Sequence, residues 1–347
     1  MSTTAPATAA TATRHRPAPR WLWLIAAYAA LAVAVLLSLA LGARDIPFGT
    51  VLDALLHPHP TTTDHTVVLD LRLPRTLIGV LAGAALAVAG TLMQGLTRNP
   101  LADPGLLGIN AGASLCVLIA ISVFGITQPA GFVWFAFTGA ALAAVVVYAV
   151  GSLGRGGATP LTLALAGAAL TAGLTSLIML VLLTDLGTFD SYRFWSVGSL
   201  SGRDLTTAAT LLPFILAGIL LALTTGRMLN TLSLGDDIAR GLGQNVTLTR
   251  VLVATAVVLL CGSATALAGP IVFVGLVVPH IIRPLSGPDH RWLIAYSLPL
   301  GPVLLLAADI LGRVIARPGE IEAGLVVAFL GAPVMIALLQ RRRLTSL

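Results

Sequence analysis

The sequence contains no lysine and only two cysteines. Its 20 basic residues are all arginine, against 14 Asp and Glu. Without lysine the chain cannot be a P-loop ATPase, which needs that side chain for the phosphates of ATP, or a pyridoxal phosphate enzyme, which needs it for the Schiff base. Cys116 and Cys261 each lie within an apolar run. We therefore expect two buried free thiols, with neither a disulfide nor a metal site.

Charge of either sign is scarce. Charged residues make up 10% of the chain and hydrophobic residues 57%, and the mean hydropathy is +0.95. A soluble globule of 347 residues needs more polar surface than this composition can supply. The composition predicts an integral membrane protein.

Long uncharged runs predict the architecture, because about 20 apolar residues in a helix cross a hydrocarbon core of roughly 30 Å. Two runs are long enough for two spans each and contain turn-forming residues, at residues 125–131 and at Gly269-Pro270. Counting each of these runs twice gives an all-helical protein with about ten spans. The predicted spans are residues 21–43, 76–97, two within 104–154, 156–184, 205–226, two within 251–282, 292–308 and 323–340.

The distribution of arginine predicts the orientation. With ten spans both termini share one side, and the segments on that side hold 13 of the 20 arginines but only 4 of the 14 carboxylates. The positive-inside rule then places both termini in the cytoplasm. We expect residues 1–20 to form a disordered cytoplasmic leader, residues 21–340 the membrane domain and residues 341–347 a basic cytoplasmic tail.

Three segments have a distinctive amino-acid sequence. Residues 71–112 begin LRLPR and contain RNPLADPGLLG, residues 269–283 read GPIVFVGLVVPHIIR, and residues 331–333 read GAP. In these segments the chain resembles the FecCD family, the permease subunits of ABC importers for ferric siderophores, haem and cobalamin. The matches run from about residue 70 to 343. Val272, where glycine is usual, and Glu322, where proline is usual, depart from the family pattern.

The resemblance implies the fold and the partners. It implies a type II ABC importer permease fold in the cell membrane of a bacterium, forming half of a pore with a second permease, itself or a paralogue. Two ATP-binding cassette ATPase subunits and an extracytoplasmic substrate-binding protein would complete the importer. The chain would carry no cofactor, no nucleic acid and no ATPase site of its own. The expected cargo is a ferric siderophore, with haem or cobalamin as alternatives.

The resemblance also implies a docking site on the outer side. Arg72 and Arg75, before the second span, and Arg313, before the last, match arginines that face glutamates of the binding protein. Charge complementarity of this kind mainly sets the encounter rate. The alternative is that these are interfacial arginines whose side chains reach lipid head groups.

Two further groups of residues match the translocation path. The residues that match cytoplasmic constrictions of the family are Asn99, Leu101, Thr159 and Leu161. Asn-Pro is equally a good turn and Thr-Pro a good helix start, so a structural role stays open. The mildly polar residues that suit a pore-lining fifth span are Thr162, Thr171, Thr175 and Ser176. Small residues also let helices pack closely, which is the alternative for these four.

The segment from about residue 231 to 245 predicts a short cytoplasmic helix. Ser233 would be its N-cap, Asp236 and Asp237 would lie in its first turn, Arg240 in its last, and Gly241 at C′. By resemblance this is the helix that couples to the ATPase. The residues assigned to it are Asp236, Asp237, Ala239, Arg240, Gly241 and Gly243. A surface helix that merely connects two spans is the alternative.

A different class of transporter stays open. An ion-coupled secondary transporter generally keeps an ionisable group at membrane depth, and no predicted span contains one. A sodium site built from backbone carbonyls at the helix breaks would still suit such a carrier, so the absence only disfavours it.

Several histidines and carboxylates lie in one predicted outer loop. They are His57, His59, His65, Asp53 and Asp64. Their spacing is irregular, and a chelated iron needs no protein ligands. We therefore expect no metal site.

Overall fold

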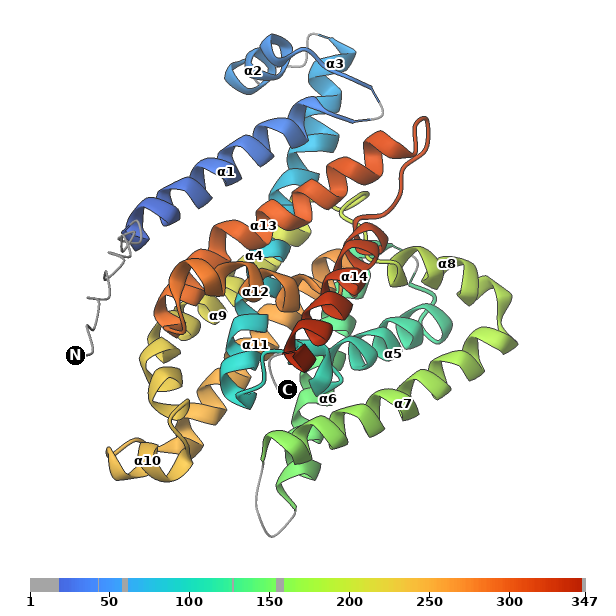
Figure 1. The fold of residues 1–347 in the computed structure, drawn as a ribbon. Helices are drawn as coiled ribbons and strands as arrows, with labels where there is room; N and C mark the ends of the chain where they lie inside the picture. Colours follow the sequence, from blue (N-terminus) through green and yellow to red (C-terminus); the bar gives the residue numbers. More distant parts are fainter. Residues whose placement is uncertain (1–18, 43, 58–61, 127, 154–158, 345–347) are drawn as a thin grey trace, which may run out of the picture.

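The protein is all-helical. The computed structural model describes residues 19–42, 44–57, 62–126, 128–153 and 159–344, and these residues form helices and no strand (Figure 1). The elements are α1 Arg20–Ala40, α2 Phe48–Leu56, α3 Thr63–Thr66, the π-helix η1 Val67–Arg72, α4 Leu73–Thr97, the 3₁₀ helix η2 Pro104–Leu107, α5 Ile109–Ser122, α6 Pro129–Ser152, α7 Pro160–Thr184, α8 Leu186–Ser196, α9 Leu205–Leu232, α10 Asp236–Gly241, α11 Val246–Ala268, α12 Val274–Ser286, α13 His290–Ile315 and α14 Ala323–Leu344. Most of the predicted leader lies outside these residues.

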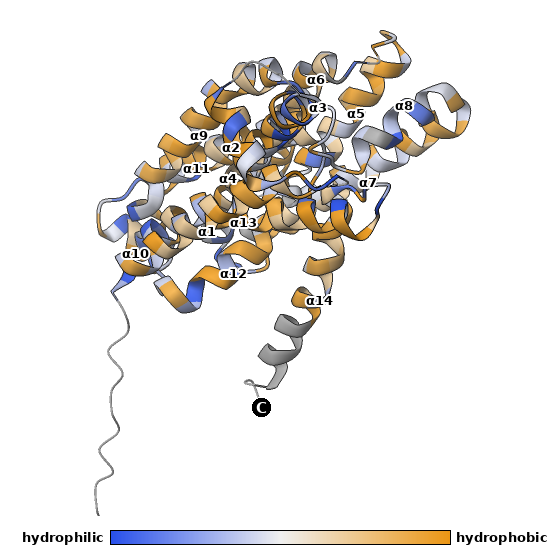
Figure 2. Ribbon diagram, turned by 90° about the horizontal axis from the view of Figure 1, so that it is seen from above, coloured by the Kyte–Doolittle hydropathy of each residue, from blue (hydrophilic) through white to orange (hydrophobic). Residues whose placement is uncertain are grey.

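Seven helical segments in the described part of the chain are long and apolar enough to cross a membrane. They are α1, the continuous run of α3, η1 and α4, and α6, α7, α9, α11 and α13. Three shorter apolar helices are α5, α12 and Ala323–Ile336 of α14. Figure 2 shows hydrophobic residues along the long helices and hydrophilic ones in connecting segments such as α10. The ten apolar helices occupy the ten predicted positions, which confirms the predicted fold class.

Two predicted spans are shorter than the helices that contain them. The ninth, residues 292–308, is the middle of α13, which continues to Ile315 and includes Asp309 and Arg313. The second is preceded without a break by η1 and the first turn of α4, so Arg75 is helical as well. The helices that contain these two spans therefore include ionisable residues, and Arg75, Asp309 and Arg313 are paired inside the protein. That the spans themselves contain no ionisable residue stays a prediction.

Helix α4 is the centre of the fold, buried among α9, α11, α12 and α13. Its glycines let neighbouring backbones approach closely. Gly83 faces Gly301 and Pro302 of α13, and Gly90 faces the backbone of Gly275 in α12. Close approach at small residues is the usual way in which membrane helices gain packing energy, since lipid gives no hydrophobic drive between helices.

We expect Gly90→Ala to lower the melting temperature of the protein in detergent. An added Cβ would overlap backbone atoms of Gly275, which cannot rotate away as a side chain could. Overpacking of this kind typically costs about 1–3 kcal/mol. Gly173→Ala is the matched control, because an added Cβ on this glycine of α7 meets nothing within 4 Å. Equal melting temperatures for the two variants would contradict this account of α4 packing.

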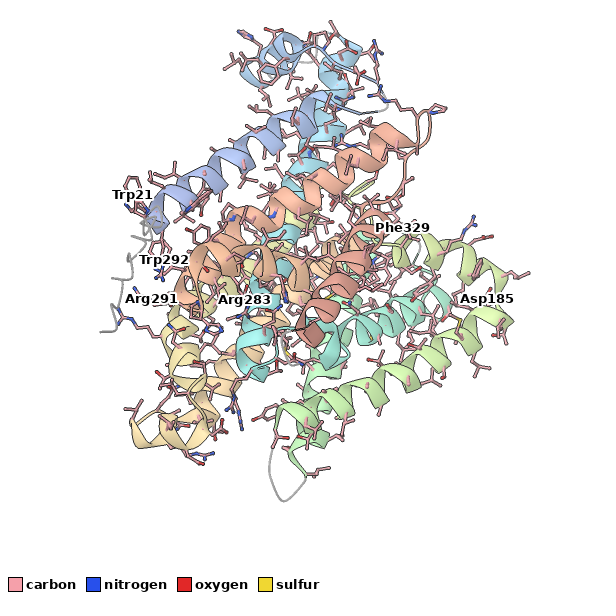
Figure 3. The ribbon with its side chains drawn as sticks, in the orientation of Figure 1. Trp21, Asp185, Arg283, Arg291, Trp292 and Phe329 are labelled. Carbon is pink, nitrogen blue, oxygen red and sulfur yellow. The ribbon has the colours of Figure 1, made fainter. Side chains whose placement is uncertain are left out.

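The connecting segments gather at two ends, which we call the α10 end and the α2 end after the short helix at each (Figure 1). Contacts between distant segments define the α10 end: Asn230 Nδ2 donates to Asp289 at 2.7 Å, and the Tyr296 hydroxyl donates to the Arg20 carbonyl. Trp21 and Trp292 lie on this side, far from Asp185 (Figure 3). Trp21 is exposed at the start of α1, which matches an interfacial position.

Candidate functional site

The three arginines predicted to dock a partner come together at the α2 end. Arg72 ends η1, Arg75 lies in the first turn of α4, and Arg313 lies in the last turn of α13. Their exposed fractions are 6%, 7% and 2%, so none of them projects freely from the surface. The fold thus brings together residues that are far apart in the sequence.

Asp309 is the centre of this cluster and is fully buried. Arg75 donates to Asp309 Oδ1 from Nε at 3.0 Å and from Nη2 at 2.8 Å, and Arg313 Nη2 lies 3.0 Å from Oδ2. Arg75 Nη1 also binds Glu320 Oε2 at 2.6 Å. A buried carboxylate persists only when paired and hydrogen-bonded, and the fork of a guanidinium supplies both.

Arg72 and Arg313 donate hydrogen bonds to the carbonyl groups at the end of α1. Arg72 Nη1 donates to the carbonyls of Leu39 and Ala40 at 2.8 and 2.7 Å. Arg313 Nη1 donates to the carbonyls of Ser38 and Leu41 at 3.0 and 2.9 Å. The last carbonyls of a helix have no partner within it, and positive charge is favourable there. Arg72 and Arg313 therefore hold the end of α1 against η1 and α13.

A cleft of about 620 Å³ opens beside this cluster. Its charged lining residues are Arg44, Arg72, Arg75, Arg203, Arg313, Asp70, Asp204 and Glu320. Arginine outnumbers carboxylate in this lining, which suits an acidic partner. Glu320 has a side chain that is 34% exposed, whereas Asp309 is buried. An incoming carboxylate could therefore take the place of Glu320 on Arg75 without uncovering Asp309.

Arg203 and Glu322 lie near each other at the α2 end. Burial lowers the pKa of the Arg203 guanidinium, and the negative charge of Glu322 acts in the opposite direction. Arg203 Nε is buried without a hydrogen-bond partner among the described residues. The unusual Glu322 thus supplies counter-charge to a partly desolvated arginine.

The predicted coupling segment forms a shorter helix than expected. Asp236 and Asp237 lie in the first turn of α10 and Arg240 in its last, as predicted. The assignments of the caps are wrong: the N-cap is Gly235, with a φ of 112°, and Ser233 Oγ instead donates to the Asn230 carbonyl at 2.6 Å. Gly241 is helical, while Gly243 has a φ of 82°. The positive φ belongs to Gly243 because the helix begins and ends later than the sequence indicated.

The predicted gate residues form a turn and a helix cap. Asn99 Oδ1 accepts a hydrogen bond from the Leu101 backbone N–H at 3.0 Å. Thr159 caps α7 through reciprocal bonds with Thr162, at 2.9 and 3.2 Å. Leu161 is 69% exposed. These contacts bear out the local turn and cap, and the gating role stays a prediction.

The helix that precedes Asn99 and the helix that Thr159 caps meet at one cavity. An apolar cavity of about 480 Å³ has Leu96 and Thr97 of α4, Leu163 of α7 and Arg250 of α11 in its lining. The end of α4 and the start of α7 therefore face the same space at the α10 end.

Helix α7 is the most exposed of the long apolar helices. Only 17% of its most apolar window is buried, against 83% for the helical run that contains α4. Of the predicted pore-lining residues, Thr175 and Ser176 are exposed, Thr171 is half-buried and Thr162 belongs to the helix cap. A bare apolar helix with hydroxyl groups on its surface fits a face that another subunit covers.

Two histidines of the predicted outer loop make contacts with one carboxylate. His57 Nδ1 and His65 Nε2 lie 3.0 and 3.2 Å from the two oxygens of Asp53, while Asp64 pairs with Arg44 at 3.1 Å. His59 lies outside the described residues. The pair of Asp53 with His65 joins α2 to α3.

Sequence reasoning missed the partners of the arginines. Asp309, Ser38 and Glu320 complete the cluster at the α2 end. Asp309 and Arg313, four residues apart on one helix face, were a usable signal, because such a pair in an apolar run points to internal pairing. No pattern in the sequence indicated the hydrogen bonds from Arg72 and Arg313 to the carbonyls of α1.

Comparison with known proteins finds a matching family and similar sequences. Residues 30–341 match the FecCD transport family. The chain is 48% identical over 306 residues to the ferric enterobactin transport system permease protein FepD of Escherichia coli (strain K12), covering 88% of this chain and 91% of that protein. It is 43% identical over 280 residues to the probable siderophore transport system permease protein YfiZ of Bacillus subtilis (strain 168), covering 81% and 84%.

A solved structure agrees with these matches. A protein described as a metal-chelate type ABC transporter in an inward-facing conformation superposes with a TM-score of 0.80 at 26% identity. The alignment covers 92% of this chain and 99% of that chain. The similarity of fold therefore extends over nearly the whole length of both chains.

Proposed function

The chain belongs to the FecCD transport family, and we propose from this membership that it is the permease subunit of an ATP-driven importer for ferric siderophores. The observation that carries the proposal is the 48% identity to a ferric enterobactin permease over most of both chains. Haem and cobalamin are the alternative cargoes. The chain would form half of a translocation pore, with a second permease against the exposed face of α7.

The two ends of the fold suit two different partners. At the α2 end the arginine-lined cleft fits acidic groups of a substrate-binding protein, with Arg72, Arg75 and Arg313 beneath it. At the α10 end, Ile238 and Leu242 are 54% and 66% exposed, an apolar surface that an ATPase subunit would cover. We accordingly propose that the α10 end and both termini face the cytoplasm of a bacterium, and that α10 is the coupling helix.

The gate and the pore follow from the same proposal. Asn99 and Leu101, in the loop after α4, would form one cytoplasmic constriction, and Thr159 and Leu161, at the start of α7, the other. Thr171, Thr175 and Ser176 would face the path along α7, while Thr162 would fix the start of that helix through its bonds to Thr159.

An ion-coupled carrier is the competing function. Its best candidate site would be the buried carboxylate of Asp309. Both oxygens of Asp309 already bind arginine, one to Arg75 and the other to Arg313. A carboxylate neutralised by two guanidinium groups is a poor site for a coupling ion, which argues for the importer.

Uptake of ⁵⁵Fe-labelled enterobactin into proteoliposomes tests the proposal. The chain, reconstituted with its second permease, its ATPase and its binding protein, is expected to accumulate the chelate only with ATP, and ionophores that collapse proton and sodium gradients should not reduce uptake. The purified chain alone should neither bind nor hydrolyse ATP. Unlabelled ferric siderophore should compete better than haem or cobalamin. Uptake driven by an ion gradient without ATP would establish the carrier instead.

A further inference from the structure

Asp236, the first residue of α10, joins three helices. One oxygen of Asp236 accepts from Arg98, the residue that ends α4, and the other accepts from Arg250 of α11 at 2.6 Å. Arg240 of α10 lies 4.0 Å away. The side chains of Asp236 and Arg250 are only 23% and 16% exposed, so water and salt screen this pair less than a surface ion pair.

Arg98 takes a backbone conformation that arginine rarely adopts. Its φ is 51° and its ψ is 28°, in the left-handed region that favours glycine. Such a residue persists only where its surroundings hold it, and such residues recur at functional sites. The ion pair with Asp236 is the contact that holds the Arg98 side chain. Arg98 immediately precedes Asn99 and lies three residues before Leu101, so its position fixes the start of this loop.

Helix α10 presents two different faces. Ile238 and Leu242 are exposed, whereas Asp236 points into the protein toward Arg98 and Arg250. The adjacent Asp237 is fully exposed and pairs only with Arg240 of the same helix among the described residues. Gly235 and Gly243, with φ of 112° and 82°, bound the helix on either side. The side chain of Asp236 is thus a direct connection from α10 to α4 and α11, alongside the packing of the buried Ala239.

We propose that Asp236 is a positioning residue that transmits movement of α10 to the loop at Asn99 and Leu101 through its ion pair with Arg98. This inference rests on the proposed function, in which α10 contacts the ATPase and the loop forms the cytoplasmic gate. Arg250 binds the same carboxylate of Asp236, so α11 moves together with α10. Asp237 carries the same charge at the same end of α10 but has no such connection.

The experiment measures the solvent accessibility of the loop at Leu101 directly and needs no transported substrate. A single thiol is introduced by Leu101→Cys in a chain carrying Cys116→Ala and Cys261→Ala, and the complex with the ATPase is reconstituted in nanodiscs. The rate of labelling by a water-soluble maleimide is measured without nucleotide and after trapping with ATP and vanadate. In the otherwise unchanged chain the two rates are expected to differ.

Asp236→Asn is expected to shrink that difference by roughly three- to tenfold while ATP hydrolysis by the complex continues. Asp190→Asn should keep the difference, because it removes a carboxylate from an exposed pair in α8 that has no connection to α10 or α4 among the described residues. Asp236→Glu should restore part of it. Arg98→Gln should reproduce the loss from the α4 side, and combining it with Asp236→Asn should add nothing further.

Several results would overturn the inference. They are equal labelling rates in the two nucleotide states of the unchanged chain, a normal difference in Arg98→Gln, or equal losses in Asp236→Asn and Asp190→Asn. Additive losses in the double variant would show that Arg98 and Asp236 act separately. Should Asp236→Asn not assemble, Arg98→Gln decides the question alone. A chain that never assembles with an ATPase would instead contradict the proposed function itself.

Discussion

Asp309→Asn is expected to destabilise the protein by about 3–5 kcal/mol, because removing one partner of a buried ion pair leaves the other charges uncompensated. Arg75 and Arg313 both bind the Asp309 carboxylate, and both are almost fully buried. Asparagine keeps the size of the side chain but offers one acceptor oxygen and no charge. The two guanidinium groups would then repel each other at the end of α13.

Unfolding in mixed micelles, followed by tryptophan fluorescence, measures this loss. Asp190→Asn is the matched control, since Asp190 and Arg193 form an exposed pair at 3.4 Å with side chains 67% and 53% exposed. Exposed pairs contribute little to stability, so the control should unfold like the unchanged protein. If Asp309→Asn also unfolds unchanged, the cluster does not hold the α2 end together.

Replacing Arg72 and Arg75 together by glutamine is expected to slow capture of the substrate-binding protein about tenfold or more and to weaken its salt dependence. Attraction between complementary charges raises association rates by large factors and is screened by salt. Glutamine is the better replacement than glutamate, because a carboxylate at these positions would face Asp309 or the carbonyls at the end of α1. Stopped-flow binding to the complex in nanodiscs, across a salt series, gives the rate.

The Asp309→Asn variant is also the control for this second experiment. It disturbs the same cluster but removes no positive charge from the cleft. Folded complex with Asp309→Asn should therefore capture the binding protein at least as fast as the unchanged complex. Equal slowing in the two variants would assign the arginines a purely structural role. Unchanged capture by the arginine variant would place docking elsewhere.

The short helix α10 shows how far local sequence signals reach. The acidic first turn and the basic last turn were correct, because charge at a helix end interacts with the nearest peptide dipoles. The cap positions were wrong by two residues. Ser233 is as good an N-cap as Gly235 in isolation, and the length of α9 decided between them, since Ser233 bonds back to the last turn of that helix.

The sequence by itself determined the class, the number and approximate places of the apolar helices and the family, because the long uncharged runs and the segments RLPR, NPLADPGLLG and GPIVFVGLVVPH are local in the chain. Only the tertiary structure decided where the charges lie. It brought Asp309 of α13 to Arg75 of α4, and Asp236 to Arg98. No sequence pattern specifies such partners, since the pairing depends on how α4 packs against α13 and α9, and that packing arises from contacts between residues distant in the chain.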